Sequence, residues 1–185
     1  MRQVERRPAQ ATDPEQQFRS FVGEVSPRLL GAALLMTGDL GSAEDLVQES
    51  LLRVYRSWSR IDDPVAAPAY AYRTLTRLAW RRVGPLRAWR FSLSPSMADG
   101  VSLSDDLPWE SREAVRAALA TVPRRQRQTL VLRYYAGLSV DETARAMGCS
   151  TGSVKSQTSD GLRRMRSALV AADQDVFATP TTTKG

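Results

Sequence analysis

Apolar residues recur at three- and four-residue spacings through most of the chain, the periodicity of amphipathic α-helices. The clearest run follows Ser42 and consists of Ala43, Leu46, Val47, Leu51, Val54, Tyr55 and Trp58. No window alternates apolar and polar residues with period two, the pattern typical of strands. The sequence therefore predicts an all-α fold.

Capping residues predict where the helices of the first half begin. Asp13-Pro14 and Ser26-Pro27 each join a capping side chain to a proline suited to the first helical position, so we expect helices to open at both sites, the second ending at Gly38. The first of these helices is expected to bury Phe18, Phe21, Val22 and Val25. A third helix is expected to open at Ser42, and a fourth to run from about residue 68 to 83, before Gly84-Pro85.

The second half has the pattern of a helix–turn–helix. Ser139 and Glu142 fit a capping box, in which each side chain satisfies the other's backbone N–H, at the start of a helix of about eight residues. Gly148-Cys149-Ser150 forms a short turn, and a longer helix follows from Thr151 to about Ala172. Upstream, one helix ends at 122–123 and another spans 124–136. We expect the last helix to bury Val154, Leu162, Met165 and Leu169.

Composition excludes several kinds of chemistry. The 185 residues contain no His and one Cys, which leaves no Cys/His zinc cluster, no His-dependent nucleophile and no intrachain disulfide. The acids are not grouped as metal ligands and no phosphate-binding loop is present, so we expect no enzyme and no cofactor. The longest apolar run, 29–36, is too short to span a bilayer and no secretory signal is present, which predicts a cytoplasmic protein without membrane insertion.

Charge indicates both a partner and an organisation. The 26 Lys+Arg and 20 Asp+Glu give a net charge of +6, which favours nucleic acid, and secondly a membrane surface, as partner. Residues 70–90 contain six Arg and no acid, 91–115 contain five acids and one Arg, and 116–135 contain five Arg and no acid. We interpret this as two DNA-facing basic blocks around an acidic, flexible linker. The expected divisions are a helical domain at 14–83, the linker at 84–108, a helix–turn–helix domain at 109–172 and a mobile tail at 173–185.

Three sets of residues are candidates for contact with partners. On the third helix, the side opposite the apolar stripe carries Asp45, Gln48, Glu49 and Leu52, which is either a protein-docking face or ordinary solvated surface. Residues 70–90 interleave Tyr70, Tyr72, Trp80 and Trp89 with arginines, a combination suited to stacking on single-stranded DNA. The alternative is that these aromatic residues belong to the core, and both readings stay open.

The last helix carries the third set. Short hydroxyl side chains and a Lys at the start of a helix can meet base edges and phosphates in a major groove, and arginines further along suit phosphate contact. The alternative is a generic helical hairpin with a solvated cationic face. Asp160 opposes the DNA reading, because it repels phosphate. The exposed residues of this set are Thr151, Ser153, Lys155, Ser156, Ser159 and Arg163.

Two segments together resemble a known family. Residues 38–58 (GDLGSAEDLVQESLLRVYRSW) resemble region two of the sigma-70 family in its extracytoplasmic-function (ECF) type. Residues 119–169, which contain GLSVDETARAMGCSTGSVKSQTS, resemble region four. Both signatures occur in the order and spacing of the family, and the VKSQTS string is similar to one actinobacterial subgroup. The resemblance covers about residues 14–172.

The resemblance implies a dissociable subunit of bacterial RNA polymerase, with core polymerase and promoter DNA as partners and, as for many members, an anti-sigma factor. It implies that Asp45, Gln48, Glu49 and Leu52 grip the coiled coil of the largest polymerase subunit. It assigns the melting and reading of the minus-ten element to residues 59–82, with Tyr70, Arg73, Arg77, Trp80 and Arg81 as DNA contacts. It assigns the minus-thirty-five element to Thr151, Gly152, Ser153, Lys155, Ser156, Ser159 and Arg163.

This chain departs from the family pattern at four positions: Arg77, Arg81, Gln157 and Asp160. The competing function is an autonomous helix–turn–helix regulator whose first domain serves dimerisation or sensing. Residues 14–83 contain no coiled-coil seam and no ligand motif, which argues mildly against that alternative.

Overall fold

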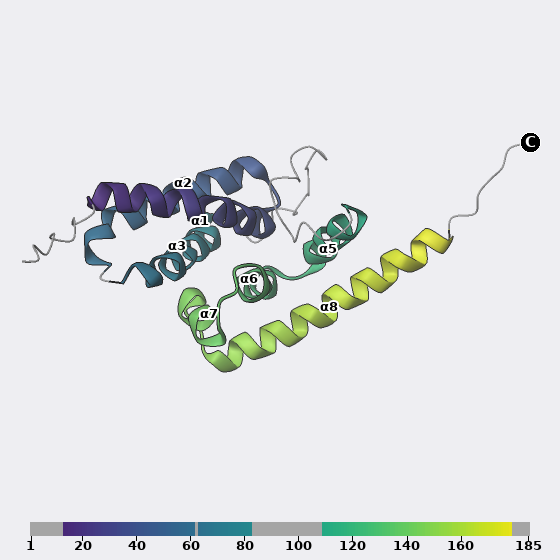
Figure 1. Ribbon diagram of the computed structural model, residues 1–185. Coiled ribbons are helices and arrows are strands. Elements are labelled where there is room, and N and C mark those ends of the chain that lie inside the picture. The colour runs from purple at the N-terminus through teal and green to yellow at the C-terminus, as the bar shows by residue number, and fades with distance from the viewer. Residues whose placement is uncertain (1–12, 62, 83–108, 179–185) are drawn as a thin grey trace, which may run out of the picture.

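A computed structural model describes residues 13–61, 63–82 and 109–178, and within these ranges every regular element is helical (Figure 1). This confirms the predicted all-α class. The expected linker at 84–108 lies outside the described residues, as do Trp89, Arg87 and Arg90 of the first basic block.

The first module contains three long helices. They are α1 (Pro14–Thr37), α2 (Leu40–Arg56) and α3 (Ala67–Arg82), with short 3-10 turns η1 (Trp58–Arg60) and η2 (Pro64–Ala66) between the last two. The second module contains α5 (Trp109–Thr121), α6 (Arg124–Leu130), the π-helical turn η3 (Val131–Tyr135), α7 (Val140–Met147) and α8 (Thr151–Ala178).

Helix α1 begins as predicted and then continues where a break was expected. The Asp13 carboxylate accepts the Glu15 amide at 3.2 Å, and Pro14 occupies the first turn. The prediction of a new helix at Ser26-Pro27 is wrong, because α1 runs unbroken to Thr37. The Ser26 hydroxyl donates to the carbonyl of Val22 at 2.6 Å and so bonds backward along the helix instead of capping a new one.

Packing explains why this proline does not break the helix. Pro27 is exposed, whereas Val25 and Leu29, four residues apart on the opposite side, are both buried. The buried stripe therefore continues across the proline, and its contacts with α2 and α3 outweigh one missing backbone hydrogen bond. The helix ends at Gly38, whose left-handed φ of 75° suits glycine, as the sequence predicted.

The N-cap of helix α2 lies three residues before the predicted one. Asp39, not Ser42, is the N-cap, and its carboxylate accepts the Ser42 amide at 2.7 Å. The predicted apolar stripe is largely confirmed, but Tyr55 is 52% exposed and Trp58 lies in η1. Tyr55 nevertheless has its ring centroid 4.9 Å from that of Phe18, so it covers the end of the core from outside.

The two modules pack against one another around a continuous core. Helix α3 contacts α7, and α1 contacts η3 and α6, so the second module covers one side of the three-helix module (Figure 1). Gly31 of α1 faces Tyr135 of η3 closely: a Cβ built on Gly31 would lie 1.8 Å from the tyrosine oxygen. Only a residue without a side chain permits this approach.

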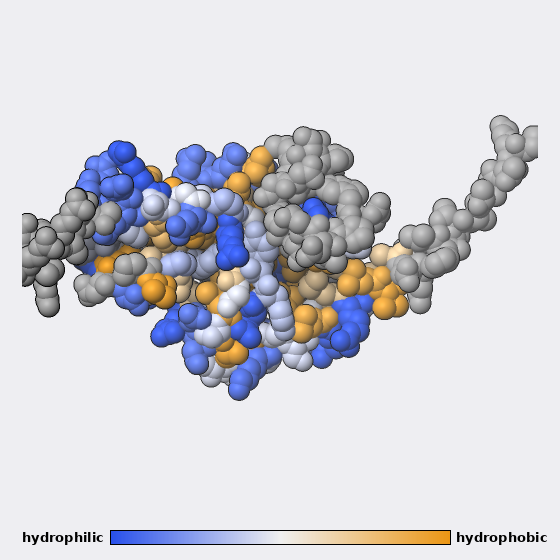
Figure 2. All heavy atoms as spheres, viewed as in Figure 1, coloured by the Kyte–Doolittle hydropathy of each residue, from blue (hydrophilic) through white to orange (hydrophobic). Residues whose placement is uncertain are grey.

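Helix α8 differs from its prediction in length and in one buried position. It continues to Ala178, beyond the expected end at Ala172. Val154 is fully buried and Met165 and Leu169 are half-buried as predicted, whereas Leu162 is 40% exposed. Val170 is also exposed, and apolar side chains gather near the end of this helix (Figure 2).

Candidate protein and nucleic-acid interfaces

The candidate docking face forms one side of α2. Asp45 and Gln48 are exposed, Leu52 is 57% exposed, and Glu49 is partly covered. The Glu49 carboxylate pairs with the guanidinium of Arg53 at 2.5 Å, one turn further along. The opposite side of α2 buries Ala43, Leu46 and Val54, so burial separates the two sides as the sequence predicted. The result is an acidic surface with one large apolar side chain at its end.

The candidate minus-ten residues share one face of α3. Tyr70 and Arg73 lie near the start of the helix, where the Arg73 guanidinium carbon is 4.9 Å from the centroid of the Tyr70 ring. Arg77, Trp80 and Arg81 follow at helical spacing and are exposed. Tyr72, by contrast, is 4% exposed and belongs to the core. The core interpretation therefore holds for Tyr72, whereas the exposed Trp80 stays a candidate for stacking.

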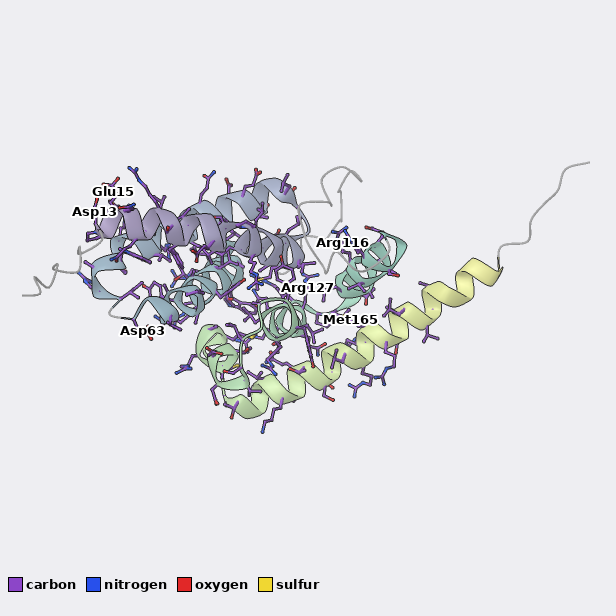
Figure 3. The ribbon with its side chains drawn as sticks, viewed as in Figure 1. Asp13, Glu15, Asp63, Arg116, Arg127 and Met165 are labelled. Atoms are coloured by element: carbon purple, nitrogen blue, oxygen red, sulfur yellow. The ribbon has the colours of Figure 1, made fainter. Side chains whose placement is uncertain are left out.

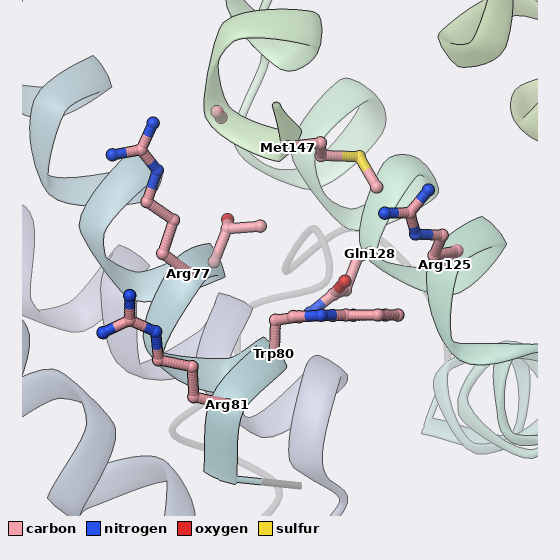
Figure 4. Close-up of a pocket in the computed structure, with 8 residues that line it drawn as sticks. Arg77, Trp80, Arg81, Arg125, Gln128 and Met147 are labelled. Carbon is pink, nitrogen blue, oxygen red and sulfur yellow. The ribbon is translucent and has the colours of Figure 1, made fainter. Parts of the chain in front are cut away.

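The far end of this face meets the second module. The guanidinium carbons of Arg124 and Arg125 lie 4.5 and 4.9 Å from the centroid of the Trp80 ring, which is cation–π geometry. Arg124 also donates to the backbone carbonyl of Ala79. Figure 4 shows Arg125 and Gln128 on one side of the indole plane, and Arg77 and Arg81 extending from α3 on the other side of a cavity.

This cavity has a volume of about 290 Å³ and is lined by both modules. Its lining from α3 consists of Thr76, Arg77, Trp80 and Arg81, and its lining from the second module consists of Arg125, Gln128, Ala146 and Met147. Gln128 is almost fully buried, and its amide nitrogen has no hydrogen-bond partner among the described residues. The sequence identified Trp80 and its neighbouring arginines, but not the side chains that meet them.

Two arginines of the second basic block, which the sequence predicted to face DNA, are instead buried. Arg116 of α5 is fully buried and Arg127 of α6 is 5% exposed (Figure 3). Arg116 lies 3.8 Å from the Glu113 carboxylate. Burial, together with the charge of Arg124, lowers the pKa of Arg127 to about 10. These two arginines therefore lie inside the protein and do not offer their guanidinium groups to DNA.

The helix–turn–helix is built as predicted. The Ser139 hydroxyl accepts the Glu142 amide at 3.2 Å, and the Glu142 carboxylate accepts the Ser139 amide at 2.7 Å, which completes the capping box. Hydrogen bonding of the Glu142 carboxylate to the side chain and the backbone amide of Ser139 lowers the pKa of Glu142. The eight-residue helix α7 ends at Gly148 with a left-handed φ of 63°. Ser150 then caps α8 by accepting the Ser153 amide at 3.1 Å.

The candidate minus-thirty-five residues occupy the exposed start of α8. Thr151, Gly152, Lys155, Ser156 and Ser159 are exposed. Ser153 is half-buried, and its hydroxyl lies 2.9 Å from the Ser150 hydroxyl. Ser153 therefore belongs partly to the turn, whereas the other side chains project outward. Val154 anchors this end of the helix from the buried side.

Two of the departures from the family pattern have structural partners. The Thr129 hydroxyl of α6 hydrogen-bonds Gln157 Oε1 at 2.7 Å, which ties α8 to the preceding helix. Asp160 pairs with Arg163 at 2.6 Å, so the acid that opposes DNA binding neutralises a candidate phosphate contact beside it.

Within the ranges that the structure describes, no helix is both long and apolar enough to cross a membrane.

Comparison with known proteins agrees with this geometry. The family model for sigma-70 region 2 matches residues 21–88, and that for sigma-70 region 4 matches residues 112–165. An RNA polymerase sigma-E factor of Streptomyces coelicolor is 34% identical over 166 residues, which cover 88% of this chain and 91% of the relative. ECF RNA polymerase sigma factor SigK of Mycobacterium tuberculosis is 27% identical over 160 residues, which cover 82% of this chain and 85% of the relative.

A solved structure shares the fold. The sigma factor RpoE of Bartonella quintana, crystallised in complex with the anti-sigma factor NepR, is similar with a TM-score of 0.67 and 20% sequence identity. The similarity covers 83% of this chain and 97% of that chain. Both sigma regions in order, and relatives that match nearly end to end, favour a sigma factor over an autonomous helix–turn–helix regulator. The chain belongs to the sigma-70 family of RNA polymerase sigma factors, in its extracytoplasmic-function type.

Proposed function

We propose that this chain recruits core RNA polymerase to promoters in the cytoplasm and supplies no catalytic group of its own. One observation carries the proposal: a single chain presents an acidic docking face on α2 and two separate cationic helix faces, on α3 and α8. An autonomous regulator needs only the α8 face. Recognition of two promoter elements together with attachment to polymerase needs all three.

The α2 face is assigned to polymerase. Asp45, Gln48, Glu49 and Leu52 offer charge and hydrogen bonding around one exposed apolar side chain, the composition of a small interface centre with a polar rim. The protein has a net positive charge, so an acidic patch on it discriminates between partners. The patch attracts a cationic protein surface and repels DNA.

The α3 face is assigned to the minus-ten element. Trp80 offers an aromatic surface for a flipped or unstacked base, and Arg77 and Arg81 flank it with charge for the DNA backbone. Tyr70 and Arg73 extend the same face toward η2, where Val65 is 86% exposed. Opening of the duplex is favoured by side chains that bind single strands more tightly than duplex.

The α8 face is assigned to the minus-thirty-five element. Thr151, Ser153 and Ser156 can exchange hydrogen bonds with base edges, and Lys155 and Arg163 can contact phosphates. Gly152 adds no side chain, so the backbone near the helix start can approach the DNA, and Ser159 lies one turn beyond Lys155.

We further propose that an anti-sigma factor is a partner. The support is that the similar solved chain was crystallised with such a protein. The exposed faces of α2, α3 and α8 are the surfaces that such a partner has to cover in order to prevent polymerase and DNA binding.

The test is reconstitution with purified bacterial core polymerase. We expect the full chain to form a holoenzyme and to direct initiation from a subset of promoters, identified by mapping bound sites across a genome and then transcribed in vitro. Failure to bind core polymerase, combined with tight binding of the chain alone to a palindromic duplex, would favour the autonomous regulator instead.

A further inference from the structure

The cavity between α3 and the second module is lined by cations without a matching acid. Arg77 and Arg81 line it from α3, and Arg125 lines it from α6 (Figure 4). None of its lining residues is an Asp or a Glu. Within the ranges that the structure describes, these three arginines form no ion pair. Packing of the modules therefore brings like charges to one cavity, at an electrostatic cost.

Trp80 supports cations at this cavity. The guanidinium carbons of Arg124 and Arg125 lie 4.5 and 4.9 Å from the centroid of its ring. A cation–π contact uses the face of a guanidinium plane and leaves the N–H groups at its edge to point elsewhere. Those of Arg125 have no acceptor among the described residues. In this arrangement the indole positions charge, so the cavity suits a phosphoryl group better than a nucleobase.

Gln128 adds an unpartnered polar side chain to the same cavity. It lines the cavity from α6 and is only 2% exposed. Its amide nitrogen has no hydrogen-bond partner among the described residues. A buried donor without an acceptor is costly, and an anionic ligand would supply the missing oxygen.

The size of the cavity limits what it can hold. Its volume of about 290 Å³ lies at the lower end of small-molecule sites, which span about 300–1,000 Å³. Ala146 and Met147 of α7 supply the apolar part of its wall. The ligand therefore has to be small and yet carry enough negative charge for guanidinium groups of both modules. A diphosphate group meets both conditions, and arginine binds phosphoryl oxygens through paired, planar hydrogen bonds.

We propose that this cavity is a binding site for a small diphosphate-bearing anion, either inorganic pyrophosphate or the diphosphate of a free nucleotide. The ligand bridges α3 and α6 and replaces the repulsion between their arginines by attraction to a shared anion. Because the site consists of residues from both modules, ligand binding and the packing of the modules stabilise one another. The inference goes beyond the proposed function, since it requires neither polymerase nor promoter DNA.

Calorimetric titration of the full chain with inorganic pyrophosphate tests the site. Divalent metal ions are left out and the ionic strength is held constant, so that the charge of the ligand and its screening do not change. We expect saturable binding at one site per chain, at least about tenfold tighter than for sulfate, which carries less charge. The midpoint of thermal unfolding should rise as pyrophosphate is added.

A parallel titration with ADP distinguishes the two sources of the diphosphate. An affinity for ADP no higher than that for pyrophosphate indicates the inorganic anion, because the nucleoside then adds nothing. A higher affinity for ADP indicates a nucleotide, whose sugar or base finds further contacts at the edge of the cavity.

Two substitutions test the contributions of the two modules. Arg81→Gln on α3 and Arg125→Gln on α6 each remove one cation from the lining, and each should weaken pyrophosphate binding about tenfold. Arg56→Gln is the matched control, since it removes the same charge from an exposed position of α2 outside the cavity. We expect it to change the affinity less than about twofold, because salt screens a distant exposed charge.

Met147 allows the charge of the cavity to be changed at constant side-chain length. Met147→Glu introduces a negative charge among the arginines and should weaken pyrophosphate binding at least about tenfold. Met147→Gln should retain the binding. Both variants lose the hydrogen bond that the Thr129 hydroxyl donates to the Met147 sulfur, so this loss cancels when the two are compared. Circular dichroism checks that each variant keeps its helix content.

Three results overturn the proposal. The first is the absence of saturable pyrophosphate binding to the wild-type chain. The second is an equal loss of affinity in Arg56→Gln and Arg125→Gln, which attributes the binding to net charge. The third is an equal affinity of Met147→Glu and Met147→Gln, both folded, which places the anion outside the cavity.

Discussion

Asp160 and Arg163 form an ion pair one turn apart on α8, with 2.6 Å between carboxylate and guanidinium. Both side chains lie on the part of the helix assigned to promoter DNA, so the acid reduces the charge that its neighbour offers to a phosphate. The pair is exposed, and exposed pairs stabilise a fold little, by about 0 to 1 kcal/mol. It acts on binding more than on folding.

Asp160→Asn is therefore expected to tighten duplex DNA binding by about three- to tenfold at low salt, since it removes a repulsive charge and frees Arg163. The affinity should also fall more steeply with salt. Asp141→Asn, an exposed acid at the start of α7, is the control for net charge. Equal tightening in both variants would attribute the effect to overall charge rather than to this pair.

Gln157→Ala is expected to destabilise the fold rather than to change base preference. The variant removes the hydrogen bond to Thr129, and the predicted cost is about 0.5 to 2 kcal/mol in the free energy of unfolding. Urea unfolding measures this cost. Ser156→Ala, the exposed neighbour, should show the reverse: unchanged stability and weaker promoter binding. A Gln157→Ala protein of wild-type stability with altered base preference would contradict the assignment.

Glu49→Lys is expected to weaken binding to core polymerase by about tenfold or more while the helix content is kept. It reverses the charge at the centre of the α2 face and replaces the pair with Arg53 by a repulsion, which costs the helix about 0.2 to 0.5 kcal/mol. Glu24→Lys makes the same charge change on an exposed position of α1. Unchanged affinity of Glu49→Lys for core polymerase would remove this residue from the docking face.

Pro27→Ala is expected to stabilise the protein by about 1 to 3 kcal/mol, because it restores a donor inside a continuous helix and removes the steric conflict of the ring. Thermal unfolding measures the gain. Pro14→Ala serves as the comparison, since a proline in the first turn lacks only a donor that has no helical partner. A loss of stability in Pro27→Ala would mean that the ring itself contributes to packing.

Tyr72→Phe is expected to change the response of the fold to alkaline pH. The Tyr72 pKa is raised to about 12 in the folded state, so the unfolded chain loses this proton first, near pH 10. The contribution of the Tyr72 phenol to the free energy of unfolding is constant below pH 10. It falls by at most about 3 kcal/mol between about pH 10 and 12. The difference in stability between Tyr72→Phe and wild type should grow in favour of the variant across this window.

Comparison of the two proteins is needed because other groups titrate there. The lowered pKa of Arg127 acts in the opposite direction, since the folded state releases that proton first. The difference in unfolding free energy between wild type and Tyr72→Phe isolates the effect of the Tyr72 phenol, because all other groups are shared. Near neutral pH, Tyr72→Phe should be at least as stable as wild type, because the buried hydroxyl has no hydrogen-bond partner among the described residues. Tyrosinate absorbance of the folded protein during titration reports the phenol directly.

Local signals predicted most of the helices and the exposure of most candidate residues. The capping box of Ser139 and Glu142, the turn at Gly148 and the exposure of Leu52 each depend on residues within one or two turns. The same local reasoning was wrong at Ser26-Pro27 and at Ser42. Both have the composition of a helix start. The Ser26 hydroxyl instead bonds the Val22 carbonyl within α1, and the Asp39 carboxylate instead caps α2 by accepting the Ser42 amide.

Long-range packing decided the rest. Periodicity and capping are properties of neighbouring residues, so they are enough to specify an all-α chain with a helix–turn–helix, an acidic face on one helix and a cationic aromatic face on another. Which arginines are buried, such as Arg116 and Arg127, and which aromatic face is covered follow from the packing of helices that are distant in sequence. Whether Trp80 faces a base or a guanidinium depends on contacts with residues more than forty positions away, such as the hydrogen bond from Arg124 to Ala79. Such contacts arise from the packing of one module on another, which no local pattern encodes.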